Sequence, residues 1–140
     1  GVYVTLSKPF KTMESILKNS GVDTRMIIFI DAVTQTAGAS LEKTDKCLFI
    51  GSPEKLSDIS VAMDQAVRAL PSQDRFVFFD SLNILLLYNE TETVARFIHF
   101  MASKMRVWKV RGIIVSLRKK EDKELIEQLT QFCDVTLDLG

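Results

Sequence analysis

A carboxylate and a hydroxyl follow directly after a run of large apolar residues in the second half of the chain. The run covers residues 76–79, and Asp80 and Ser81 come next. A hard cation such as Mg²⁺ takes oxygen ligands, and in phosphoryl-transfer sites an aspartate holds it, usually through water. An acidic residue in this place can also end a buried strand and cap the next helix. Asp80 is therefore the candidate metal ligand, with Ser81 as a candidate binding residue beside it.

Other polar residues stand where apolar segments end. They are Ser7, Lys8, Asp31, Ser116 and Arg118. Asp31 could join Asp80 in a cation site, or it could cap the loop that follows it. A lysine such as Lys8 would attract an anion. The basic run from Arg118 to Lys120 also has a simpler interpretation, as a solvated turn.

One histidine and two cysteines are too few for several common kinds of site. His99 has no His, Cys or acidic neighbour at ligand spacing, so we expect a surface or boundary residue. Cys47 and Cys133 lie in apolar runs, which predicts two buried free thiols. A clustered zinc site is excluded, and a Ser-His-Asp or Cys-His arrangement is hard to build.

The elements that must position these residues alternate along the chain. We predict strands over residues 2–6, 26–30, 47–50, 76–79, 112–117 and 135–139, and a surface loop over residues 34–46. We predict helices from Pro9 to about residue 19, from Pro53 after an N-cap at Ser52 to about residue 70, from an Asn89–Glu92 capping box to Trp108, and over residues 121–131. The second helix could begin as a separate short turn.

Apolar strands between amphipathic helices indicate an α/β layered fold with a mostly parallel central sheet flanked by helices. Sites in such sheets lie at the carboxyl ends of the strands, where the polar residues above stand. The segment from Leu85 to Tyr88 is either a buried turn of helix or a subunit interface.

Composition sets limits on the partners. The chain has 140 residues, of which 46% are hydrophobic and 26% charged, as expected for one globular domain. Its 18 basic and 18 acidic residues balance, which argues against duplex DNA or an acidic membrane as the partner. We see neither a signal peptide nor an apolar run of the roughly 20 residues that a membrane span needs, so we expect a cytoplasmic protein.

The ordered set of segments resembles the RecA-superfamily ATPases of the KaiC-like group, and most closely their small archaeal members. Residues 1–23 resemble the second core strand of that group and the helix after it. Residues 76–85 resemble its Walker B strand, and residues 112–140 resemble its later strand, acidic helix and terminal strand. The resemblance implies a single RecA-like domain over residues 1–140 that lacks the first strand and its phosphate-binding loop. It also implies ATP and Mg²⁺ as the ligands of the fold.

Two departures from that group matter. No G-x-x-x-x-G-K-[ST] loop occurs, and the six glycines are too dispersed to form one. The group places this loop upstream of the strand that opens the chain. In addition, the acidic positions that orient the attacking water fall on Ser7 and Lys8, and neither residue can act as a carboxylate base.

The resemblance and its departures together predict a non-hydrolysing or degenerate relative that serves as a regulatory or assembly module. Asp80 would keep a Mg²⁺ or polar-network role, and Ser7, Lys8, Ser116 and Arg118 would line the remnant pocket. We expect a protein partner or a homo-oligomer, without membrane or nucleic acid. Two alternatives stay open: a working ATPase whose loop lies upstream, and an interaction scaffold that binds no ligand.

Overall fold

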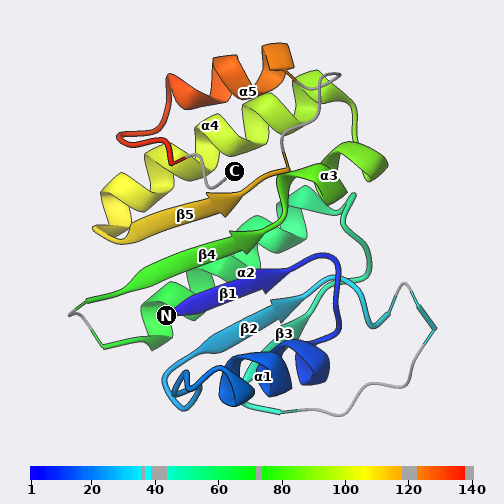
Figure 1. Ribbon diagram of the computed structural model, residues 1–140, viewed down its shortest axis with the longest axis vertical. Helices are drawn as coiled ribbons and strands as arrows, with labels where there is room; N and C mark the ends of the chain where they lie inside the picture. Colours follow the sequence, from blue (N-terminus) through cyan, green and yellow to red (C-terminus); the bar gives the residue numbers. More distant parts are fainter. Residues whose placement is uncertain (36, 39–43, 72–73, 118–122, 138–140) are drawn as a thin grey trace.

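A sheet of five parallel strands lies at the centre of the molecule, in the order β3-β2-β1-β4-β5 (Figure 1). The structure is a computed structural model that describes residues 1–35, 37–38, 44–71, 74–117 and 123–137. The strands are β1 (Val2–Thr5), β2 (Ile28–Asp31), β3 (Cys47–Phe49), β4 (Phe76–Asp80) and β5 (Arg111–Val115). The helices are α1 (Phe10–Asn19), α2 (Leu56–Ala69), α3 (Leu82–Tyr88), α4 (Thr91–Trp108) and α5 (Lys123–Thr130).

Alternating side chains along the strands give the sheet two different faces. Val4 and Phe79 point to one face, where they join the larger buried cluster with residues of α2 and α4. Tyr3 and Phe29 point to the other face, where they pack with Phe10 of α1. Successive strand residues point to opposite sides, so helices on both faces explain why these strands are apolar almost throughout.

This arrangement confirms the predicted α/β layered fold with a parallel central sheet flanked by helices, and it is consistent with a RecA-like layered fold. The opening strand β1 lies in the middle, because it pairs with β2 on one side and β4 on the other. A further strand could therefore join this sheet only at β3 or at β5.

The second predicted helix starts three residues later than its Ser-Pro signal indicates. α2 begins at Leu56, and the preceding residues form a separate short turn. In this turn the Ser52 hydroxyl oxygen accepts the Glu54 amide at 3.1 Å, and the Lys55 amide donates to the Ser52 carbonyl at 3.1 Å. Ser52 therefore caps this turn and not the helix, as the separate-turn alternative expects.

The predicted Asn89–Glu92 capping box is wrong. α4 begins after Glu90, which makes no side-chain capping bond. The Asn89 side-chain amide instead donates to the carbonyl oxygens of Leu85 at 3.1 Å and Pro53 at 3.2 Å. The side chain thus closes the end of α3 and ties it to the turn before α2.

Two predicted strands differ from the observed chain path. β2 begins at Ile28, because Met26 lies in a turn and is 57% exposed. Residues 135–137 of the predicted last strand form no strand, and residues 138–139 lie outside the described part of the chain. Cys133, which precedes this segment, is consequently exposed, so its predicted burial is wrong, whereas Cys47 is buried as predicted.

The segment after β4 is buried at its start and exposed at its end. α3 buries Leu82 and Leu85, whereas Leu87 is 74% exposed and Tyr88 is also exposed. The predicted buried turn is therefore correct only for its first half.

Among the described residues, no helix is both long and apolar enough to cross a bilayer.

Candidate functional site

Two aspartates flank the central strand at the carboxyl edge of the sheet. Thr5, the last residue of β1, is in register with Asp31 of β2 on one side and with Asp80 of β4 on the other. The chain leaves β1 in one direction, through α1 to β2, and leaves β4 in the other, towards β5. Ligands of parallel α/β sheets bind where neighbouring strands diverge in this way. The structure therefore brings Asp80 and Ser81 to the same edge as Ser7 and Lys8.

Asp80 is held by a tyrosine from the neighbouring strand. The Tyr3 hydroxyl donates to Oδ2 of Asp80 at 2.8 Å. The Tyr3 ring is buried and stacks on Phe78, with ring centroids 5.0 Å apart. Burial, together with the bond to Asp80 and its charge, raises the pKa of Tyr3 above its ordinary value, so the hydroxyl stays a donor. The peptide bond between Asp80 and Ser81 is cis.

The carboxylate of Asp80 keeps a route to solvent. Its side chain is half-buried, and among the described residues Tyr3 is its hydrogen-bond partner at one oxygen only. The second oxygen is the atom that a hydrated cation could approach. No group of three or more His, Cys, Asp or Glu residues in the described part of the chain is arranged to hold a metal directly. A cation would therefore be held mainly through water.

Asp31 is fully buried, and both of its oxygens are engaged. Oδ2 accepts the Phe10 amide at 2.8 Å, and Oδ1 accepts the amides of Val33 at 2.7 Å and Thr34 at 2.9 Å. The Thr34 hydroxyl also donates to Oδ2. Of the two roles predicted for Asp31, this geometry supports the loop cap, because both carboxylate oxygens already accept hydrogen bonds from the protein.

The same bonds decide what the turn after β1 can hold. The Phe10 amide opens α1, and helix amides of this kind are the groups that bind a phosphate in nucleotide sites. Here the carboxylate of Asp31 takes that amide, and the preceding residue, Pro9, has no N–H. A second anion would meet both an occupied donor and a buried negative charge. The described residues of this turn therefore do not fit a triphosphate.

Ser7 and Lys8 lie in this turn and are exposed. The buried Thr5 hydroxyl donates to the Lys8 carbonyl at 2.6 Å, and the Leu6 amide donates to the Asp80 carbonyl at 2.8 Å. These bonds fix the backbone of the turn and leave both side chains in solvent. No carboxylate belongs to this turn, so it offers no general base of the acidic type.

Asn83, which the sequence analysis does not identify, holds the chain after β5 in place. Asn83 of α3 donates to the Leu117 carbonyl at 3.3 Å and accepts the Leu117 amide at 2.6 Å. Ser116 is exposed and donates to the same carbonyl at 3.3 Å, and Arg118 lies outside the described residues. A buried asparagine within the apolar run of α3 is the signal that could have indicated Asn83.

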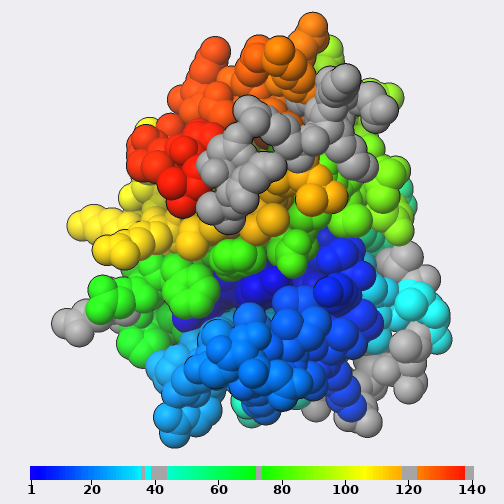
Figure 2. All heavy atoms as spheres, in the orientation of Figure 1, coloured from blue at the N-terminus to red at the C-terminus, as the bar shows by residue number. Residues whose placement is uncertain are grey.

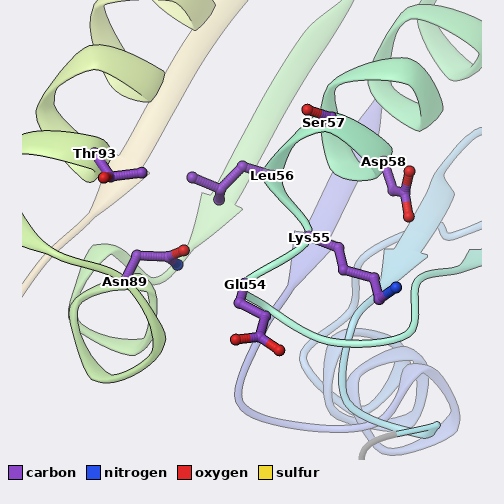
Figure 3. Close-up of a pocket in the computed structure, with 7 residues that line it drawn as sticks. All are labelled: Glu54, Lys55, Leu56, Ser57, Asp58, Asn89 and Thr93. Carbon is purple, nitrogen blue, oxygen red and sulfur yellow. The ribbon is translucent and has the colours of Figure 1, made fainter.

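A separate open hollow of about 390 Å³ lies between the starts of α2 and α4. Figure 3 shows Leu56 and Thr93 pointing toward one another across it, and Asn89 lies on the same side of the hollow as Thr93. Glu54 and Asp58 bring two carboxylates to its lining, and Lys55 brings one ammonium group. None of the predicted site residues that the structure describes lines it.

Comparison with known proteins gives one family. The chain belongs to a family of unknown function (DUF7504), which matches residues 2–139. No curated protein matches the chain.

Proposed function

We propose that this member of the family is a non-hydrolysing relative of the RecA/KaiC-like ATPases that serves as a regulatory or assembly module. The observation that carries the proposal is the turn after β1, where the resembled group has its acidic residues and this chain exposes Ser7 and Lys8. The start of α1 is also closed to an anion, because its first amide donates to the buried carboxylate of Asp31.

The lack of a base supports the same conclusion. Hydrolysis needs a group within hydrogen-bond reach that can take a proton from water. The turn after β1 exposes Ser7, Lys8 and Pro9, and none of these side chains is a carboxylate. Of the two aspartates beside β1, Asp31 is enclosed, and Asp80 accepts the Tyr3 hydroxyl at one oxygen.

Asp80 keeps a smaller part in this proposal. Its half-buried carboxylate could retain a hydrated Mg²⁺, or it could serve only as the polar partner of Tyr3. In the alternative with a phosphate-binding loop upstream of this chain, Asp80 is the carboxylate that would hold the Mg²⁺ of Mg·ATP. The three outcomes are a silent module, a nucleotide-responsive module and a working ATPase.

The test is phosphate release from Mg·ATP by the full-length protein, together with calorimetric titration of Mg·ATP. The key variant is Asp80→Asn, because the amide oxygen can still accept the Tyr3 hydroxyl while the charge that attracts a cation is lost. Asp45→Asn, at an exposed position, is the matched control. We expect the natural protein to release phosphate no faster than Asp80→Asn.

Faster release by the natural protein and by Asp45→Asn, with Asp80→Asn folded but inactive, would overturn the proposal and establish an active ATPase. Mg·ATP binding without release, weakened in Asp80→Asn, would identify a nucleotide-responsive module. An absence of binding at millimolar ATP would favour the ligand-free scaffold. Circular dichroism of each variant separates a lost site from a lost fold.

A further inference from the structure

Among the described residues, one edge of β5 lies open. β5 pairs with β4 on one side only, so within the described residues the other side of its five residues has no strand partner. Its side chains are also partly open to solvent, because Ile113 is 48% exposed, and Figure 2 shows the atoms of this strand at the surface in orange. Edge strands expose unpaired N–H and C=O groups that readily accept another strand. The opposite edge, β3, has only three residues and is a poorer template.

A segment suited to such an edge lies in the same chain. Residues 135–137 (Val-Thr-Leu) alternate in polarity and carry two β-branched residues, the pattern of a half-buried strand. In the structure they form no strand, and Val135 is 73% and Leu137 78% exposed. Two large apolar side chains in solvent, two residues apart, form one strip that an adjoining strand edge could cover.

The start of this segment is tethered close to β5. Asp134 pairs with Arg106 at 3.4 Å, and Phe132 stacks on His99 with ring centroids 4.4 Å apart. Both partners belong to α4, and the neighbour of Arg106, Met105, packs directly over Gly112 of β5. The tether therefore holds the start of the segment on α4, the helix that also packs against β5. The connection from β5 through α5 is also long enough for a parallel crossover.

We infer that residues 135–137 are a strap that docks on the free edge of β5 as a sixth parallel strand, and that the structure holds this strap undocked. The tether favours this occupant over a second copy, because it gives the segment a high effective concentration at its own edge. Docking closes the edge, and release of the strap offers β5 to another chain. This second step rests on the assembly role proposed above, whereas docking itself does not.

Hydrogen exchange of the full-length protein, resolved at residues 111–117, tests the docking. We expect the β5 amides that face away from β4 to be protected in the natural protein. We expect them to exchange at least about tenfold faster in Leu137→Asp, since a charge on the strap opposes burial. Leu87→Asp, an equally exposed leucine on α3, should leave these rates unchanged. Equal exchange in the natural protein and Leu137→Asp would overturn the inference.

Light scattering of the same proteins tests whether residues 135–137 or a second copy of the chain covers the edge of β5. We expect one chain per particle for the natural protein, association of Leu137→Asp through its open edge, and loss of that association when Ile113→Lys is added. A natural protein with two chains per particle that Leu137→Asp separates would make a second copy the occupant and overturn the inference. Phosphate release is measured separately, so a failure of the proposed function is told apart from a failure of the strap.

Discussion

Two aspartates flank the central strand, and their hydrogen-bond partners determine what each can do. Asp31 accepts bonds at both oxygens and is sealed from solvent, so it stabilises the loop after β2 and the start of α1. Asp80 accepts one bond from Tyr3 and remains half-buried, so it can still meet a ligand. The chemical difference comes from the surroundings, since both are aspartates at the ends of neighbouring parallel strands.

Asp31→Ala should be strongly destabilising. The substitution leaves the amides of Phe10, Val33 and Thr34 without their acceptor in or near the core. An unpaired buried donor costs about 1–3 kcal/mol, so we expect the free energy of unfolding to fall by about 3 kcal/mol. Urea denaturation measures the loss, and Asp45→Ala at an exposed position serves as the control. A loss similar to that of the control would show that Asp31 is not the structural cap described here.

Tyr3→Phe should reduce stability in a pH-dependent way. At pH 8 we expect the loss of the bond to Asp80 to cost about 1 kcal/mol, with the ring stacking retained. The pKa of Tyr3 is raised in the folded protein, mainly by burial, from an ordinary value of 10.0. Above about pH 10 the unfolded chain therefore loses this proton more readily than the folded chain, and the natural protein loses stability that the variant cannot lose.

Denaturant unfolding of both proteins between pH 8 and pH 11 measures this difference. Groups other than Tyr3 titrate alike in the two proteins, so the gap in the free energy of unfolding isolates the phenol. We expect the gap to narrow as the pH rises past 10. A constant gap would mean that Tyr3 ionises equally well in the folded and unfolded chains.

Only some of the individual residues of the candidate site could be predicted from the sequence. Asp80 and Ser81 stand out because an apolar strand ends just before them. Tyr3 does not, because it lies 77 positions away from Asp80 and meets it only through the register of β1 and β4. Asn83 was missed because it stands within an apolar helix, where only the tertiary contact with Leu117 gives it a role.

The elements themselves follow from periodicity, whereas their ends depend on distant partners. The five strands of the sheet and the amphipathic helices lie where apolar runs and helical spacing predict them. The Asn89 capping box failed because a carbonyl of the turn before α2 competes for the same side chain. The last predicted strand failed in the structure for a related reason. A strand needs a paired edge, and residues 135–137 make no such pairing.

Gly112 shows how closely β5 and α4 approach. A Cβ atom at this position would overlap the Met105 sulfur, so Gly112→Ala must displace a buried side chain. We expect a loss of about 1–2 kcal/mol in the free energy of unfolding, as overpacking usually costs. In a Met105→Ala background the same change should be neutral or slightly stabilising, because alanine suits a strand better than glycine.

A double-mutant cycle followed by urea denaturation separates these effects. A coupling energy above about 0.5 kcal/mol would identify the Met105 contact as the cause. Equal costs in both backgrounds would instead locate the strain in the backbone of β5.

At the scale of the whole molecule, the two faces of the sheet are unequal. The larger cluster lies under α2 and α4, and the smaller one lies under α1 alone. Both clusters contain or contact side chains of β1, β2 and β4. The two clusters therefore depend on the same three strands. Shared strands of this kind predict one cooperative unit, although the two clusters differ in size.

Two natural probes report on the two faces. Trp108 packs at the border of the larger cluster, and its indole N–H donates to Asp64 at 3.2 Å. Cys47 is buried in the smaller cluster, and burial raises the pKa of its thiol, so the folded protein presents little reactive thiolate. The exposed Cys133 should react with a thiol reagent in the folded protein, and a Cys133→Ser background removes that signal.

In that background, Trp108 fluorescence and Cys47 labelling should change at the same urea concentration, because the strands common to both clusters cannot melt under one face alone. Pulsed labelling across a urea series measures the urea concentration at which half of the Cys47 thiols become reactive. Labelling of Cys47 at clearly lower urea than the fluorescence change would mean that α1 and its cluster open first. The end of α1 that Asp31 holds would then be a separable part of the site, and the turn containing Ser7 and Lys8 could rearrange without unfolding the rest of the sheet.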